Sequence, residues 1–136
     1  MSIKTWKKIH YPVEAGDCPT DNLSLLKHAL LKWTGLREDV LKKHKLTVTR
    51  SGDVMDRDDY FSIDTETCSL CIRYYKSNSN CKKCPLYKVK KAACDSYASG
   101  DNGYSPYGEW AVLSNPEPMI ALIEAAIKKA EIKEQP

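Results

Sequence analysis

Five cysteines within one short stretch of the chain constrain its fold more than any other feature. Two Cys-x2-Cys pairs, Cys68/Cys71 and Cys81/Cys84, are separated by nine residues, and Cys94 follows after nine more. A Cys-x2-Cys turn directs two thiolates at one ion, and two such turns complete a tetrahedral shell of four sulfurs. We therefore predict a structural zinc knuckle in which the four paired cysteines are the ligands.

Other assignments of these cysteines stay open. Cys94 can replace Cys68 as a ligand, and the five cysteines can instead hold an iron–sulfur cluster. Disulfide bonds would need an oxidising compartment, but the chain shows no apolar leader and no run of about 18 apolar residues that could span a membrane. We therefore expect a cytoplasmic protein with reduced cysteines. Cys18 stands apart from the others and is expected to be a plain buried thiol.

The net charge of +3 is mild, but the middle of the chain is bipolar. Residues 53–66 hold six acids and one arginine, a net charge of −5, and residues 67–94 hold seven basic residues and no acid. The acids do not have the alternating spacing of a calcium-binding loop, so they form either a solvated turn or a surface that offers carboxylates to a basic groove on a partner. The predicted partner-binding residues are Asp53, Asp56, Asp58 and Asp59.

The basic stretch supports an alternative, because lysines neutralise phosphates and its interleaved tyrosines can stack on bases. Exposed lysines that balance the charge of nearby thiolates are the simpler explanation. As a nucleic-acid surface, the stretch would act through Arg73, Lys82, Lys83, Lys88, Lys90 and Lys91.

Apolar residues at intervals of three and four predict a helical hairpin and a C-terminal helix. Asp21 or Thr20 can cap a first helix at residues 22–33, and a second helix follows directly at 37–45. Asn115 can cap the last helix, which has prolines in its first turn. We expect these helices to share one core that includes Leu26, Leu30, Trp33, Ile123 and Ile127.

The segments between the helices carry weaker signals. Residues 47–50 and 60–63 are rich in β-formers on either side of a Ser51-Gly52-Asp53 turn, which predicts a small antiparallel ribbon. An extended lead-in is expected at residues 1–20 and a loop at 95–108. The whole chain, residues 1–136, is thus expected to form one α+β domain with a helical hairpin, a β-ribbon, a four-cysteine zinc knuckle at 66–94 and a C-terminal helix.

No motif in the chain specifies a reaction. The sequence has no P-loop, no Gly-x-Ser-x-Gly and no Gly-x-Gly-x-x-Gly, and the paired cysteines lack the His-x-Glu of zinc deaminases. A closed shell of four thiolates would leave no position for substrate. We therefore expect a protein that is not an enzyme, and only the tyrosine-rich residues 97–107 favour an enzyme or a protein that sequesters a nucleotide signal.

Taken together, the motifs resemble a group of small uncharacterised proteins of tailed bacteriophages and prophages. The resemblance rests on TWKKIHYPV, LKHALLKWTGLREDVLKKHKL, CSLCIRYY, CKKCPLYK with the cysteine after it, and SPYGEW before the last helix. It implies a phage origin and the cytosol of a bacterial host, without an established activity. Small phage proteins often inhibit host machinery, and zinc-containing anti-CRISPR inhibitors exist among them.

We therefore expect a zinc-stabilised binding protein that inhibits a host macromolecule. The resemblance favours as its partner a host protein or nucleoprotein complex, such as a defence nuclease of the CRISPR–Cas type whose nucleic-acid surface would be blocked. The alternatives are a zinc-dependent DNA- or RNA-binding protein acting through residues 73–91, and the nucleotide-sequestering protein or enzyme.

Overall fold

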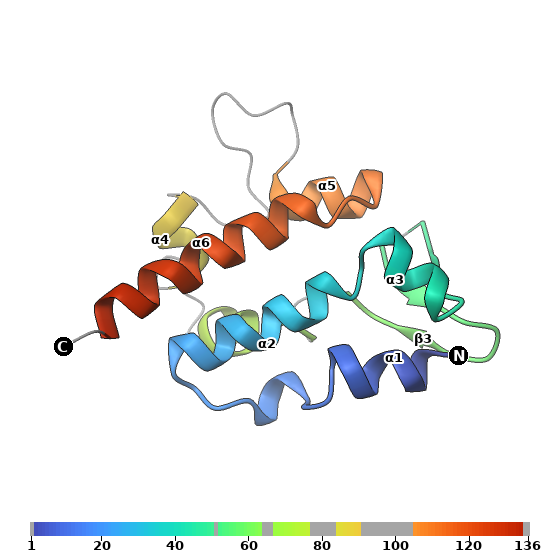
Figure 1. Cartoon of the computed structure of the whole chain (residues 1–136), viewed down its shortest axis with the longest axis horizontal. Helices are drawn as coiled ribbons and strands as arrows, with labels where there is room; N and C mark the ends of the chain where they lie inside the picture. Colours follow the sequence, from blue (N-terminus) through green and yellow to red (C-terminus); the bar gives the residue numbers. More distant parts are fainter. Residues whose placement is uncertain (1, 51, 64–66, 77–83, 91–104, 135–136) are drawn as a thin grey trace.

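Two long helices form the centre of the molecule (Figure 1). The structure is a computed structural model that describes residues 2–50, 52–63, 67–76, 84–90 and 105–134. Helix α2 (Asn22–Thr34) packs against α6 (Glu117–Glu134). The predicted cap of α2 is confirmed, since the Asp21 carboxylate accepts the N–H of Ser24 at 3.0 Å.

The predicted core between these helices is also confirmed. Leu26, Trp33 and Ile123 are buried, and Leu30 and Ile127 pack at its edge. At the start of α6, the Asn115 side chain accepts the N–H of Glu117 at 3.2 Å, as the sequence predicts.

The N-terminal segment is not the predicted extended lead-in. It forms helix α1 (Ile3–His10), in which the Ser2 hydroxyl accepts the N–H of Thr5 and the Thr5 hydroxyl accepts the N–H of Ser2. This reciprocal cap satisfies two backbone donors at the helix start. Trp6 then lies fully buried against α2, and its indole N–H donates to the carbonyl of Gly35 at 2.8 Å.

The turn between α2 and α3 (Glu38–Lys43) explains why residue 35 is a glycine. A glycine at the end of a helix often has left-handed backbone angles, yet Gly35 has right-handed ones, with φ −70° and ψ −10°. Its lack of a side chain is needed for close packing instead, because a Cβ atom would lie 2.5 Å from Cγ of His10.

The β-structure is a three-stranded antiparallel sheet, not a two-stranded ribbon. Strands β1 (Thr47–Val48), β2 (Val54–Met55) and β3 (Tyr60–Phe61) pair in sequence order. The middle strand was missed because it lies inside the acidic run. Val54 pairs with Phe61 on the buried face, and Met55 pairs with Tyr60 on the exposed face.

Two further helices lie on α6 (Figure 1). Helix α4 (Pro85–Lys90) directly follows Cys84, whereas α5 (Pro106–Leu113) begins inside the predicted loop. The Trp110 side chain of α5 donates to the carbonyl of Gly52 at 2.7 Å. Gly52 has φ +85°, which favours glycine, and it brings the β1–β2 turn onto α5.

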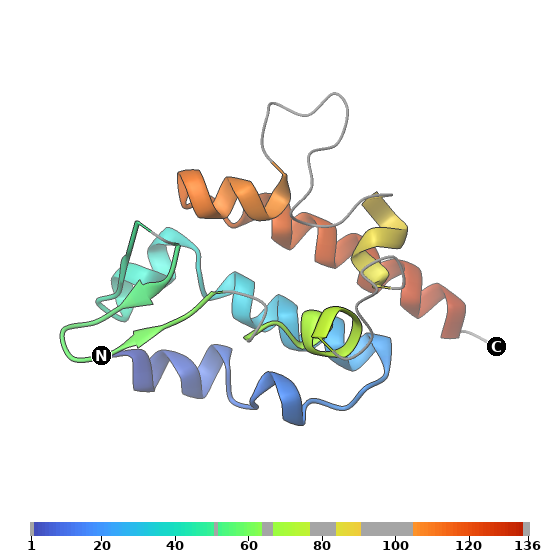
Figure 2. The same ribbon diagram turned by 180° about the vertical axis from the view of Figure 1, so that it is seen from behind.

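Short helical turns complete the described chain. A 3-10 turn, η1 (Ala15–Asp17), precedes α2, and a π-helical turn, η3 (Cys71–Lys76), lies beside α2 (Figure 2). The chain is thus α+β, as predicted, with helices in the majority. Among the described residues, no helix is long and apolar enough to cross a membrane.

The close contact at Gly35 yields a stability prediction. Gly35→Ala should lower the free energy of unfolding by roughly 1–3 kcal/mol, because the new methyl group overlaps the His10 ring. In a His10→Gly background the same change should cost clearly less, since the ring and the His10 Cβ atom, which would lie 2.8 Å from the new methyl group, are both gone. A double-mutant cycle measured by urea denaturation tests this, and additive effects of the two changes would contradict it.

Candidate metal centre

Three of the predicted zinc ligands lie in the described part of the chain. Cys71 begins the π-helical turn η3, Cys68 lies three residues before it, and Cys84 directly precedes α4. All three are partly buried. Cys81 and the alternative ligand Cys94 lie outside the described residues.

The first pair has the local geometry of a thiolate knuckle. The Cys68 sulfur accepts a hydrogen bond from the Cys71 thiol and further ones from the backbone N–H groups of Leu70 and Cys71. The carbonyl of Cys68 also accepts the N–H of Ile72 at 2.9 Å, which closes the turn. A zinc ion bound by four thiolates would hold two such sulfurs about 3.8 Å apart, for Zn–S bonds near 2.3 Å.

Three polar contacts fix residues 67–76, which we call the cysteine segment, to α2. The buried Ser69 hydroxyl donates to the carbonyl of Leu25 at 2.8 Å, and the Tyr74 hydroxyl donates to the side chain of Asn22. At the other end of the segment, the carbonyl of Thr67 accepts from the ammonium group of Lys32 at 3.2 Å. The segment therefore follows α2 over its length, as Figure 2 shows.

Lys32 is the residue of this site that the sequence analysis missed. Only 1% of Lys32 is exposed, which is rare for lysine, and its ammonium group lies 5.3 Å from the centre of the Trp33 ring. A signal was present in the sequence, because residues 25, 29 and 32 form one apolar stripe of α2 in which only Lys32 is charged.

These contacts favour the ionised form of Cys68. The hydrogen bond from Cys71 is the largest effect, and together with the charge of Lys32 and the two backbone N–H groups it overcomes burial and lowers the pKa of Cys68 to about 5. Cys18 behaves oppositely, since burial raises the pKa of its thiol. Cys18 lies in the core and donates to the carbonyl of Ser24 at 3.5 Å, as expected for a plain buried thiol.

Cys84 interacts with Tyr74 of η3. Burial raises the pKa of Tyr74, and the charge of Cys84 contributes to that rise, so the two side chains are close. No three His, Cys, Asp or Glu side chains within the described ranges gather closely enough to hold a metal ion. Among the described residues, only the pair Cys68 and Cys71 thus fits part of a thiolate site. Cys84 is described but does not gather with this pair, and Cys81 lies outside the described residues.

The structure divides the four predicted partner-binding acids into two groups. The Asp53 carboxylate accepts the N–H of Ile63 at 3.0 Å, and Asp56 accepts N–H groups from Ile3, Asp58 and Asp59 at 2.7–2.8 Å. Hydrogen bonds, the one from Ile3 being the largest, lower the pKa of Asp56. Asp53 and Asp56 therefore hold the hairpin together, and Asp58 and Asp59 are exposed at its end.

The alternative basic set is described only in part. Arg73 is an exposed residue of η3, and Lys88 and Lys90 lie in α4. Lys82, Lys83 and Lys91 lie outside the described residues, as does most of the tyrosine-rich stretch 97–107. Tyr107 has a structural role: its hydroxyl donates to the carbonyl of Ile63 at 2.6 Å, and its ring lies edge-on to Trp33.

Comparisons with known proteins identify no relative. No protein-family model, no curated protein and no solved structure matches the chain.

The contacts at Cys68 predict an unusual titration. The test follows the ultraviolet absorption of thiolates against pH after a chelator has removed the metal. The part of this absorption that disappears in Cys68→Ser belongs to Cys68, and its titration midpoint should lie near pH 5. Because this pKa is lower in the folded state than in the unfolded chain, the thiolate stabilises the fold above the ordinary cysteine pKa, and that contribution is lost as the pH falls towards 5.

Lys32→Met is the critical variant in this titration. It removes the positive charge beside the sulfur, so the midpoint should rise toward the ordinary range of a cysteine. Cys18→Ser is the control and should leave the acidic step in place. An unchanged midpoint in Lys32→Met would show that Lys32 does not act on Cys68.

Proposed function

We propose that the chain is a zinc-stabilised, non-enzymatic protein that binds and inhibits a macromolecule of a bacterial host. The binding part of this proposal is carried by one observation: a rigidly held acidic hairpin end with exposed apolar side chains beside it. The zinc part is supported by the hydrogen-bonded pair Cys68 and Cys71 and by the buried charge of Lys32.

In this proposal one zinc ion is held by Cys68, Cys71, Cys81 and Cys84, with Cys94 as the alternative ligand. Four thiolates give such a site a net charge of −2, and a buried ammonium group near Cys68 offsets part of it. A site with four protein ligands has no open position, so the ion has a structural role. An iron–sulfur cluster on the same cysteines is the minority alternative.

Elemental analysis tests the metal. The purified protein should contain one equivalent of zinc, and Cys84→Ser should lose most of it. Cys18→Ser should retain the zinc, because the Cys18 thiol lies in the core and makes a hydrogen bond there. Thiolate–metal binding energy is also folding energy, so Cys84→Ser should expose the cysteine segment to proteases. Less than half an equivalent of zinc in the wild type, or a brown protein rich in iron, would contradict the assignment.

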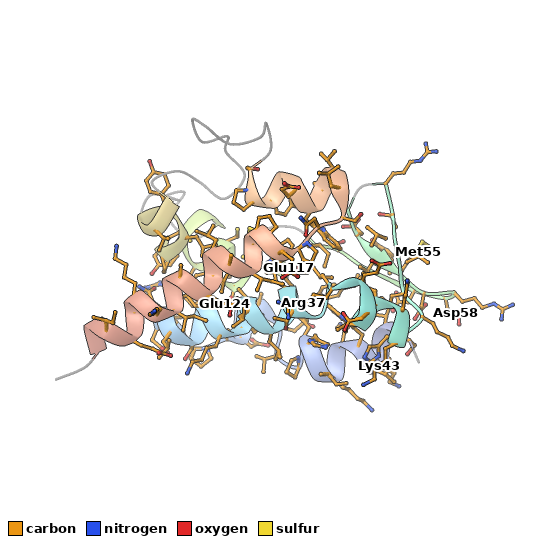
Figure 3. All side chains as sticks on the ribbon, turned by 45° about the horizontal axis from the view of Figure 1, so that its top comes forward. Arg37, Lys43, Met55, Asp58, Glu117 and Glu124 are labelled. Atoms are coloured by element: carbon orange, nitrogen blue, oxygen red, sulfur yellow. The ribbon has the colours of Figure 1, made fainter. Side chains whose placement is uncertain are left out.

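The binding surface is the hairpin tip, which we define as Met55, Asp58, Asp59 and Tyr60. Tyr60 is 65% exposed and Met55 40% exposed, and they form a cross-strand pair on the outer face of the sheet. Figure 3 shows Met55 and Asp58 at the same end of the molecule. Tyrosine and methionine are enriched at protein interfaces, and neighbouring carboxylates steer the encounter with a basic surface.

The tip is held in place before it meets a partner. The Asp56 carboxylate accepts three backbone N–H groups, one of them from Ile3 at the start of α1. A preorganised surface loses less conformational entropy on binding. A basic nucleic-acid-binding surface fits such a tip, and the resemblance to phage proteins favours a CRISPR–Cas effector complex as the partner.

Charge reversal at the tip tests this function. Asp58→Lys with Asp59→Lys should slow association with a guide-loaded CRISPR–Cas effector about tenfold or more at low salt, because electrostatic steering is reversed. Both carboxylates are exposed, so stability and zinc content should not change. Surface plasmon resonance at two salt concentrations measures the effect.

The matched control is Glu124→Lys with Glu131→Lys on α6, which changes the net charge equally. Both residues are exposed, and Glu124 lies on α6 away from the tip (Figure 3). Equal slowing by the two pairs would contradict a role of the tip. A wild-type protein that does not bind the effector would exclude this partner.

A further inference from the structure

A second charged surface forms where α1 meets the end of α3. We define the α1–α3 lysine face as Lys4 and Lys8 on α1 with Lys43 and Lys45 at the end of α3, all exposed. These lysines come from two short basic runs that lie far apart in the sequence, and neither run belongs to the basic stretch 73–91. The fold alone brings them together.

Two contacts hold these helices side by side. Nδ1 of the buried His44 lies 3.3 Å from the Thr5 hydroxyl, and the His10 and His44 rings meet edge to face with centres 6.4 Å apart. On α1, Lys4 and Lys8 are one helical turn apart, on the side opposite the buried Trp6. Figure 3 shows Lys43 beside α1.

The charge of this face is not neutralised within the described chain. None of its four ammonium groups takes part in a described ion pair, whereas Lys7 lies 3.8 Å from Glu14 and Lys42 lies 2.9 Å from Glu38. Exposed acids also lie on or near these elements. Asp39 precedes Lys43 by one turn of α3, and Asp58 and Asp59 belong to the hairpin tip, which Arg57 accompanies. The face therefore carries four positive charges that no described ion pair neutralises.

His44 reports the same positive surroundings. Burial is the main cause of its lowered pKa, and the positive charges of His10 and Lys43 lower it further. Lys43 is thus close enough to His44 to act on it electrostatically.

We propose that the α1–α3 lysine face binds the phosphate backbone of double-stranded nucleic acid. Lysines without acidic partners bind phosphates by charge and release condensed counter-ions from the duplex. Trp6, the aromatic residue of α1 between the two lysines, is buried, so the face cannot stack unpaired bases. Binding should therefore be independent of sequence, steeply dependent on salt, and stronger for a duplex than for a single strand.

This inference is independent of the hairpin tip and of any protein partner. Together the two surfaces would suit a nucleoprotein, in which the acidic tip meets a basic protein surface and the lysine face meets phosphates. Plain duplex DNA tests the lysine face alone, so failure here and failure of the proposed function are distinguishable.

The test is fluorescence anisotropy with a labelled random-sequence DNA duplex and with its single strand, over a series of salt concentrations. Two variants each remove two charges: Lys4→Gln with Lys8→Gln, and Lys43→Gln with Lys45→Asn. Asparagine suits position 45 because Lys45 has φ +57°. Each pair should weaken duplex binding at least fivefold at low salt and reduce the slope of log affinity against log salt by about 1.8, or 0.9 for each lost phosphate contact.

The control pair is Lys128→Gln with Lys129→Gln, two exposed lysines of α6. It removes the same charge and should leave the slope nearly unchanged. Because the two test pairs lie on different helices, misfolding of one variant, seen by circular dichroism, leaves the other to decide.

Several outcomes would overturn the proposal. These are no binding of duplex by the wild type, preference for the single strand, or an equal loss in the control pair. The proposal would also be wrong if only Lys82→Gln with Lys83→Gln weakened duplex binding, since binding would then belong to the lysines of the second cysteine pair. Binding to vesicles of acidic phospholipid but not to DNA would assign the face to a membrane surface instead.

Discussion

The polar contacts along α2 connect the N-terminal segment, the cysteine segment and the aromatic core to one helix. His10 and Trp6 bond to carbonyls at its C-terminal end, at Leu31 and Gly35. The Ser69 hydroxyl donates a hydrogen bond to the carbonyl of Leu25 on the same helix. The Lys32 ammonium group donates to the carbonyl of Thr67, just before the first cysteine pair. The carbonyls of Leu31 and Gly35 lie at the end of the helix, where backbone acceptors have no partner within the helix, so these contacts satisfy them.

This arrangement gives the molecule two parts that differ in what stabilises them. Around the C-terminal half of α2, tryptophans and aliphatic residues bury a continuous core, with Trp33 edge-on to Trp110 at 5.8 Å between ring centres. The cysteine segment and α4 contribute few fully buried apolar side chains among their described residues, chiefly Leu70 and Leu86. The cysteine segment is instead held by polar contacts, to which a bound metal ion would add a cross-link.

Sequence reasoning succeeded where periodicity and capping agree. The limits of α2 and α6 follow from an apolar repeat that begins at a capping side chain, at Asp21 and at Asn115. Helix α1 was missed because its cap uses threonine in place of the usual acidic partner, so the pattern at Ser2 is weak. Strand β2 was missed because two residues between aspartates carry no strand signal; its pairing with β1 and β3 is a tertiary effect.

The candidate site was likewise predictable only in part. Spacing identified the cysteine pairs, but no local pattern shows that Lys32 approaches Cys68 from a helix some 35 residues away in sequence. Composition identified the acidic run without separating the carboxylates that accept backbone N–H groups, such as Asp56, from those left to solvent, such as Asp58. The α1–α3 lysine face depends on the contact between Thr5 and His44, which only the fold provides.

The central claim is that a metal ion holds the cysteine segment onto an α2 core that is stable without it. Amide hydrogen exchange, measured by mass spectrometry with and without a zinc chelator, tests it most directly. Removing the metal should sharply reduce the protection of residues 67–76 and of α4, while the amides of α2 around Leu26 to Trp33 stay protected. Unchanged protection of residues 67–76, or an equal loss throughout α2, would contradict the account.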